Sequence, residues 1–292
     1  LGKPANEART LKLNVRPSPK QSNFNVALEY GRSVRAALAL SDFPRQPRLE
    51  RGELRINAGS AQLPEAPGLA VIAHLPRWSP ESSVQSSDAN TSDGSTKRPR
   101  TPNVKDGVKT TGFLTVLRRM EARIDDLVIS GRSLGKIDLK LSRSNDEIRL
   151  DCEGESLAGR VTVPDAPTPQ RPVNVALQRA YVSEAVDRLA ERPALAEIDP
   201  RQLPSLVVTV GDLRIGEIKP GRLRVVAIPG PAGIHLTEIS LNSERQRIAA
   251  TGQWRQVSGR QVTELDAKLE GESLGGVLAA FGYPNNGIER GK

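Results

Sequence analysis

The chain has 292 residues, a formal net charge of +8 at pH 7, and only 37% hydrophobic and 3% aromatic residues. This length suffices for one large domain or two ordinary ones, but with so few aromatics the apolar interior must rely on Leu, Val, Ile and Ala, as in sheets buried on one face. A single cysteine, Cys152, excludes an intrachain disulfide and a cysteine zinc site, and no apolar run of about eighteen residues is present to span a bilayer.

Residues 1–78 alternate apolar and polar side chains, which is typical of strands with one buried face. Leu11, Leu13 and Val15 form the first alternating run, and further runs follow up to Leu75. Pro, Gly and Ser separate these runs, so the region reads as an antiparallel meander. The chain starts almost directly on this pattern, without a charged and then apolar leader, which predicts a fragment of a longer protein.

Residues 79–112 interrupt the pattern with Ser, Thr, Asp, Asn, Pro and Lys and almost no large apolar side chain. Such a segment cannot offset its ordering entropy, so we predict a disordered linker or loop. Its basic residues Lys97, Arg98 and Arg100 could contact nucleic acid or anionic lipid, although a solvated charge run is the more common meaning of this composition.

Residues 113–292 resume the alternation, with Ile137, Leu139 and Leu141 as an early example and runs through Leu269. A weak repeat relates residues 126–141 to residues 212–225, which indicates a repeating β unit. Helical spacing occurs twice. Residues 182–189 predict a short helix ending before Pro193, and residues 273–282 predict a closing helix that Ser273 caps. The predicted fold is therefore mainly all-β: an elongated curved antiparallel sheet or β-groove with one or two short helices.

Catalytic and metal-binding patterns are not evident in the sequence. His74 and His235 occupy polar positions of strand-like runs, far apart in the chain, and are expected to face solvent. Asp125, Asp126 and Asp212 fall where turns are expected. We therefore expect their side chains to serve the backbone of the turn and not to act as an acid or a base. No glycine-rich nucleotide motif joins a strand to a helix. The sequence therefore predicts a non-enzymatic protein with no cofactor and no metal.

The positive charge leaves nucleic acid, anionic lipid or a well-solvated surface as explanations. Arginines recur singly on the polar side of the runs, as at Arg35, Arg55, Arg149 and Arg224, which favours the solvated surface. Single-strand binders also need stacking aromatics, which are scarce here, so no nucleic-acid partner is expected.

Several stretches resemble one protein family when taken in their order along the chain. They are residues 198–204 (IDPRQLP), residues 212–216 (DLRIG), residues 248–254 (IAATGQW) and residues 274–284, with an upstream match over residues 63–78. These stretches resemble the carboxy-terminal part of the YhdP branch of the AsmA-like family, which is related to TamB. The insert at residues 79–112 departs from that pattern.

The resemblance implies a periplasmic protein anchored in the bacterial inner membrane by an amino-terminal helix outside this chain. Such proteins form a long sheet with an apolar concave face that carries phospholipid between the inner and outer membranes. The partners implied are phospholipid acyl chains, the inner membrane and possible envelope proteins. A structural or interaction module of the envelope without lipid transfer is the alternative.

The alternation fits both an open groove and a sandwich whose apolar faces pack together, and only the resemblance favours the groove. If the groove exists, eight residues are predicted to line it: Leu139, Leu141, Leu206, Val208, Leu223, Val225, Ile248 and Ala250. They would lie in β-groove segments at residues 113–292, preceded by another at residues 1–78.

Overall fold

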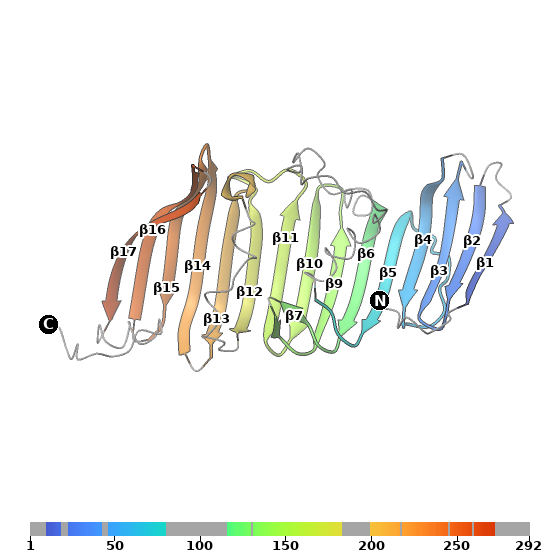
Figure 1. Cartoon of the computed structure of the whole chain (residues 1–292), viewed down its shortest axis with the longest axis horizontal. Coiled ribbons are helices and arrows are strands. Elements are labelled where there is room, and N and C mark those ends of the chain that lie inside the picture. Colours follow the sequence, from blue (N-terminus) through green and yellow to red (C-terminus); the bar gives the residue numbers. More distant parts are fainter. Residues whose placement is uncertain are drawn as a thin grey trace, which may run out of the picture. The chain divides into compact units, whose positions relative to one another are not determined.

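The computed structural model describes residues 10–18, 23–42, 46–79, 116–129, 131–182, 199–216, 218–244, 246–258 and 260–271. These residues are almost entirely strands, which confirms the predicted all-β fold (Figure 1). The predicted closing helix at residues 273–282 and nearly all of the predicted linker at residues 79–112 lie outside the described residues. The helix predicted at residues 182–189 also lies outside them, except for Val182, which is the last residue of a strand. The chain divides into two compact units, Leu1–Ile129 with Asp138–Arg143, and Ser130–Ile137 with Ser144–Lys292.

Unit 1 is built from neighbouring strands in chain order. They are β1 (Leu11–Pro17), β2 (Asn23–Tyr30), β3 (Val34–Ser41), β4 (Arg48–Ile56), β5 (Gly68–Leu75), β6 (Leu117–Ile124) and β9 (Ile137–Arg143). A separate two-stranded pair joins β7 (Val128–Ile129) and β8 (Arg132–Ser133). The break predicted at Asp125 and Asp126 is confirmed, because β6 ends at Ile124 and β7 begins at Val128.

Unit 2 also keeps its strands in chain order. They are β10 (Glu147–Gly154), β11 (Leu157–Pro164), β12 (Val173–Val182), β13 (Leu206–Ile215), β14 (Ile218–Gly230), β15 (Gly233–Asn242), β16 (Gln246–Val257) and β17 (Arg260–Gly271). One 3-10 helix, η2 (Pro200–Gln202), precedes β13. Hairpins join most neighbours, because antiparallel strands can be connected by short turns.

The simple antiparallel meander predicted for residues 1–78 is wrong in one respect. β5 pairs in parallel with both β4 and β6, and in unit 2 β12 pairs in parallel with β13. A parallel pair needs a longer connection than a hairpin, because the chain must return to the starting end of the previous strand. Residues 57–67, 76–116 and 183–205, which separate the strands of the three parallel pairs in the sequence, provide that length.

The turn predicted at Asp212 is also wrong. β13 runs without interruption from Leu206 to Ile215, and its pairing with β14 shifts register between Val210 and Leu213. The shift is a β-bulge, which adds a residue without ending the strand. The extra residue keeps Val210 and Leu213 on one face. The apolar positions of this run therefore change from even to odd residue numbers at the bulge, without a turn.

Candidate functional site

Unit 2 carries a continuous apolar face, because residues paired across neighbouring strands share a face. A middle row crosses every strand from β10 to β17 in register. Its members are Leu150, Val161, Val175, Val208, Val225, Ile239, Ala250 and Ala267. None of these side chains is fully buried, and Ala267 is exposed. The middle row is therefore apolar and incompletely covered.

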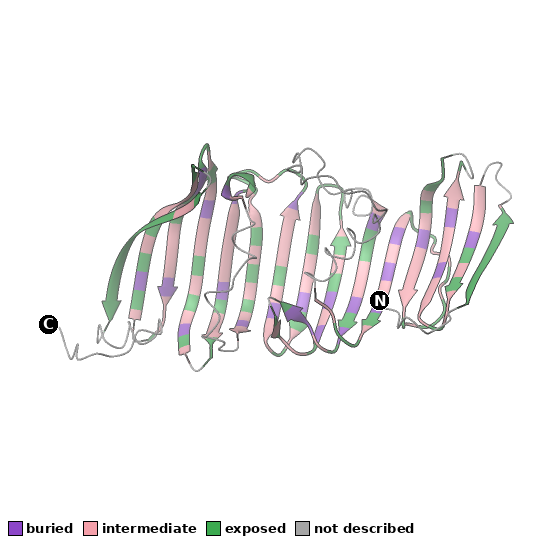
Figure 2. Cartoon of the chain, viewed as in Figure 1, coloured by how far each residue is buried: buried purple, intermediate pink, exposed green. Residues whose placement is uncertain are grey.

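A flanking row runs beside the middle row and is more buried. It comprises Cys152, Gly159, Leu177, Val210, Leu223, Leu241, Ile248 and Leu269. Leu241 and Ile248 form a small core cluster against which Leu213 and Leu223 pack. At the edge strand β17 the packing ends, since Leu265 is 55% exposed and Leu269 is 42% exposed (Figure 2).

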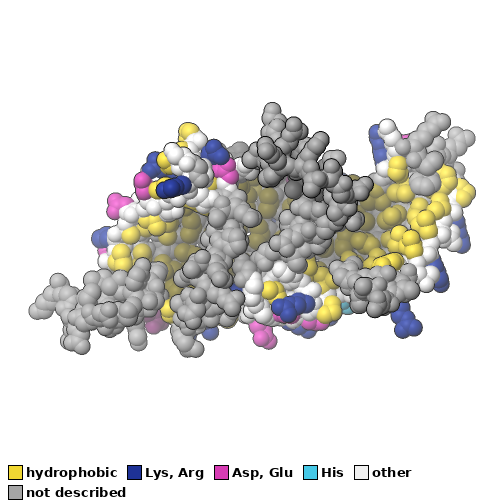
Figure 3. Space-filling model, in the orientation of Figure 1, with side chains coloured by type: hydrophobic (Ala, Val, Ile, Leu, Met, Phe, Trp, Pro, Cys, Tyr) yellow, Lys and Arg dark blue, Asp and Glu magenta, His cyan; other side chains and the backbone are white. Residues whose placement is uncertain are grey.

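The described strands place no second sheet over this face, because they form one main sheet of 15 strands and the short β7–β8 pair. Within the described part of the chain, the sandwich alternative therefore lacks its second layer. Figure 3 shows apolar side chains gathered on the visible face of the unit 2 sheet, over the strands β14 to β17.

Six of the eight predicted groove residues meet on this face of unit 2. Val208 pairs with Val225, which continues through Ile239 to Ala250. Leu223 continues through Leu241 to Ile248, and Leu206 lies one row away opposite Ala227.

The other two predicted residues, Leu139 and Leu141, belong to unit 1. Leu139 is 8% exposed, and Leu141 packs against a buried cluster of Leu69, Val71 and Leu117. The prediction also omitted Val175, Ile239 and Ala267, although each lies in an alternating run. Their shared row follows from the strand register, which the sequence does not show.

Unit 1 has an apolar face of its own, which is more tightly packed at its centre. The cluster of Leu69, Val71 and Leu117 is also contacted by half-buried Leu38, Leu49, Leu54, Val116 and Met120. At the edge strand β1 the face opens, because Leu11 and Leu13 are each 60% exposed.

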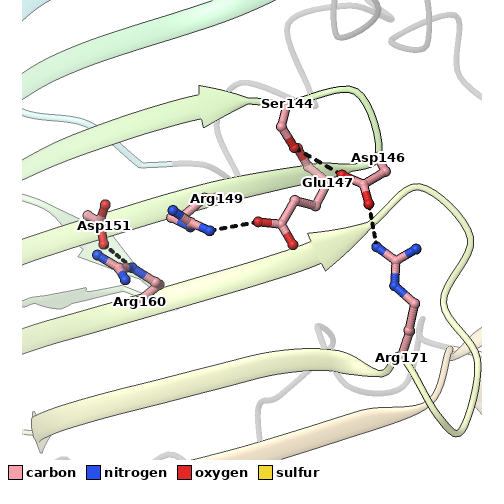
Figure 4. Close-up of polar contacts among 7 residues, drawn as sticks. All are labelled: Ser144, Asp146, Glu147, Arg149, Asp151, Arg160 and Arg171. Carbon is pink, nitrogen blue, oxygen red and sulfur yellow. Dashed lines mark hydrogen bonds and ion pairs between the residues drawn. The ribbon is translucent and has the colours of Figure 1, made fainter.

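The opposite face of unit 2 is polar and carries ion pairs between neighbouring strands. Arg160 Nε lies 2.5 Å from Asp151 Oδ1, and Arg224 Nε lies 3.0 Å from Glu238 Oε2. Figure 4 shows Asp151–Arg160 with two further pairs, Glu147–Arg149 at 2.8 Å and Asp146–Arg171 at 3.0 Å, and with Ser144 donating to Asp146 at 3.2 Å. The arginines predicted to be merely solvated, such as Arg149 and Arg224, are thus also paired with carboxylates.

A cluster on the polar side joins the parallel strands β12 and β13. Tyr181 donates its hydroxyl to Asp212 Oδ2 at 2.7 Å, and Arg214 Nη2 lies 2.8 Å from the same oxygen. The Arg214 guanidinium also stacks 4.2 Å from the centre of the Tyr181 ring. The hydrogen bond from Arg214, reinforced by the one from Tyr181, lowers the pKa of Asp212. This arrangement links the two parallel strands, and two hydrogen bonds hold the Asp212 carboxylate.

Among the described residues, His74, His235 and Cys152 lie on three different strands. His74 and His235 are exposed on β5 and β15, as predicted. Cys152 is buried on the apolar face, and burial raises the pKa of its thiol. Within the described ranges, no three His, Cys, Asp or Glu side chains are placed to hold a metal ion. No helix in these ranges is long and apolar enough to cross a membrane.

The family model described as YhdP protein matches residues 1–292. No curated protein and no solved structure matches the chain.

Proposed function

Because the chain belongs to the YhdP family, we propose that the apolar face of unit 2 binds phospholipid acyl chains and carries them between the inner and outer membranes. Family membership and the large sheet fit a protein of the cell envelope. In the proposal the protein works in the periplasm, is held at the inner membrane and catalyses no reaction. The observation that carries the proposal is the middle row, which is apolar in register across every strand from β10 to β17 and has no fully buried side chain.

The energetics suit an acyl chain. Each methylene removed from water contributes about 0.8 kcal/mol, so a continuous apolar row rewards a long chain more than a compact ligand. Neighbouring strands are about 4.8 Å apart, so a row that crosses eight strands offers roughly 34 Å of apolar surface.

The test compares two neighbouring valines on opposite faces of β13. Val208 lies in the middle row, whereas Val207 faces the polar side and pairs with Val226; both are half-buried. The protein carrying Val208→Asp should capture less photoreactive phospholipid than the wild type, because a carboxylate in the row makes acyl burial costly. Val207→Asp, the matched control, should capture as much as the wild type.

Circular dichroism and urea unfolding of both variants separate the outcomes. A folded Val208→Asp variant with normal lipid capture contradicts the proposal. Absence of lipid from the folded wild-type protein would instead favour a structural or interaction module of the envelope. Global unfolding by Val208→Asp alone would mean that this face is a closed core.

A further inference from the structure

The polar face of unit 1 carries two kinds of arginine. Four of them are paired with carboxylates: Arg35 with Glu29, Arg55 with Glu53, Arg119 with Glu121 and Arg123 with Asp138. Arg51 of β4 and Arg118 of β6 differ from these, because no hydrogen bond or ion pair among the described residues engages either side chain. Lys12 and Lys140 on this face are also outside the described ion pairs. What distinguishes Arg51 and Arg118 is that they lie beside each other.

The strand register brings Arg51 and Arg118 to the two sides of Gly68. Arg51 on β4 lies opposite Gly68 on β5 in a parallel pair. On the other side of β5, the pairing with β6 shifts register between Leu69 and Ala70, and Arg118 is the residue that β6 gains there. Such a β-bulge redirects the side chain of its extra residue. Arg118 can therefore turn towards β5.

The side chain of Arg118 lies over Gly68. A Cβ at Gly68 would collide with Arg118 Cγ and would lie 3.3 Å from Arg118 Cδ. Gly68 also has a φ of 89°, in the left-handed region that favours glycine. The stem of Arg118 thus fills the place of the missing side chain, directly beside Arg51. Because neighbouring strands are about 4.8 Å apart, both long side chains can reach one small anion.

Both arginines belong to the polar face. Leu69 follows Gly68 and packs in the apolar cluster of unit 1. Its partner Gly52 follows Arg51 on β4. Since side chains alternate along a strand, Gly68 and Arg51 lie on the opposite face. Arg51 is half-buried and Arg118 is exposed, so solvent reaches the pair.

The carboxylates around this pair of arginines do not neutralise it. Those nearest in register each accept a hydrogen bond from another residue: Glu50 from Asn23, Glu53 from Arg55 and Glu121 from Arg119. Glu65, in the loop before β5, is exposed and forms no ion pair with either arginine. Two guanidinium groups side by side repel each other, and an anion between them replaces this repulsion with attraction.

We propose that Arg51 and Arg118 bind a phosphate group on the polar face of unit 1. A phosphate group has enough acceptor oxygens for two guanidinium groups at once, and each planar guanidinium can bind it through two N–H donors. The source of this group is a free phosphate ion or the head group of an anionic lipid at a membrane surface. The site is separate from the acyl-chain row of unit 2, so it does not rest on the proposed function.

Two assays on the full chain at low salt test the site and distinguish the two sources. Phosphorus NMR follows the titration of inorganic phosphate, and cosedimentation compares vesicles of phosphatidylglycerol with vesicles of phosphatidylcholine. Binding of inorganic phosphate indicates the free ion, and binding of phosphatidylglycerol vesicles alone indicates a lipid head group. In either assay the double variant Arg51→Gln/Arg118→Gln should bind about three- to tenfold more weakly than the wild type, the range expected for two partly exposed charge contacts. Absence of wild-type binding in both assays overturns the inference.

Lys12→Gln/Lys140→Gln is the matched control, because it removes the same charge from exposed positions of the same face and should bind like the wild type. An equal loss in the control would mean that net charge alone attracts the anion, and it overturns the assignment to Arg51 and Arg118. Circular dichroism checks that both variants fold, and Arg118→Gln alone replaces the double variant if that one unfolds. Val208→Asp leaves this site unchanged, so its phosphate binding should match the wild type even where lipid capture is lost.

Discussion

Units 1 and 2 follow one plan, with apolar residues in register on one face and charged residues on the other, yet they cover the apolar face to different degrees. At the centre of unit 1, Leu69, Val71 and Leu117 are 3–7% exposed and are packed by residues from several strands. In unit 2 the middle row holds no fully buried side chain. The same alternation thus produces a packed cluster at the centre of unit 1 and, in unit 2, a more buried flanking row beside a middle row that stays partly exposed.

The neighbours of each row explain this difference. In unit 1, bulky Leu38, Leu49, Leu54 and Met120 close over the central cluster. In unit 2 the middle row consists of Leu, Val, Ile and Ala, and ends in Ala250 and Ala267 on the last two strands. Small and β-branched side chains rise little above the sheet, so they leave the row accessible.

The largest expected difference in stability comes from placing a carboxylate on the apolar face of each unit. Val71→Asp should lower the free energy of unfolding by about 3–5 kcal/mol, because Val71 is 7% exposed and no cation is available to the new carboxylate within its cluster. Val208→Asp should cost only about 1 kcal/mol, since water reaches its half-buried site.

The two tryptophans allow each unit to be followed separately in urea. Trp78 belongs to unit 1 and Trp254 to unit 2, so Trp254→Phe leaves a reporter of unit 1 and Trp78→Phe leaves a reporter of unit 2. Equal losses of stability for the two aspartate variants would show that both faces are closed cores.

A smaller loss of stability is expected when one glycine in each unit is replaced by alanine. A Cβ at Gly252 would collide with the backbone oxygen of Glu264 on β17, so the two strands must shift, and Gly252→Ala should cost about 1–3 kcal/mol. A Cβ at Gly52 would meet Leu38 Cδ2 at 2.6 Å, and this flexible side chain can move. Gly52→Ala should therefore lower the free energy of unfolding by less than Gly252→Ala. Urea unfolding with the same tryptophan reporters measures both. A larger loss at Gly52 would mean that the unit 1 cluster is too rigid to adjust.

The smallest expected effect is the dependence on pH. The hydrogen bonds from Arg214 and Tyr181 lower the pKa of Asp212 in the folded state. A carboxyl group with a lowered pKa stabilises the fold above its unfolded value, which is about 3.9, and this contribution disappears as the pH falls through the folded pKa. Asp212→Asn should therefore reduce the loss of unit 2 stability between neutral pH and about pH 3, as measured by Trp254 fluorescence in urea.

Unit 1 provides the comparison for this titration. Burial alone would raise the pKa of Glu53, but hydrogen bonds from Arg55 and from the Gln62 amide lower it overall. Glu53→Gln should reduce the acid sensitivity of unit 1 in the same direction. Asp266→Asn in β17, outside the described ion pairs, is the control for unit 2. An unchanged pH profile in Asp212→Asn would show that other carboxylates dominate acid unfolding.

The predicted groove residues show where sequence reasoning succeeded. Leu206 and Val208, Leu223 and Val225, and Ile248 and Ala250 were each assigned to one face of a strand, and the structure brings all six onto one face of unit 2. The reasoning worked because alternation is a local property with a period of two residues.

Leu139 and Leu141 show what the alternation alone does not predict, namely which residues share a face with residues of distant strands. Their alternation is as regular as that of Leu206 and Val208, yet β9 belongs to unit 1, where Leu141 joins a packed cluster. The bulge at Asp212 and the parallel pairing of β5 were likewise hidden, because each depends on a partner strand that is distant in the sequence.

By itself the amino-acid sequence determined the strands of this protein, the side of each strand that is apolar, and the turn residues that separate most of them. Only the tertiary structure decided which strands are parallel, which apolar residues form one row, and how far each row is covered. The reason is physical: the direction of a side chain along a strand follows from the adjacent residues. The exposure of the same side chain depends on strand pairing and on segments such as η2, which contacts β14, β15 and β16 from elsewhere in the chain.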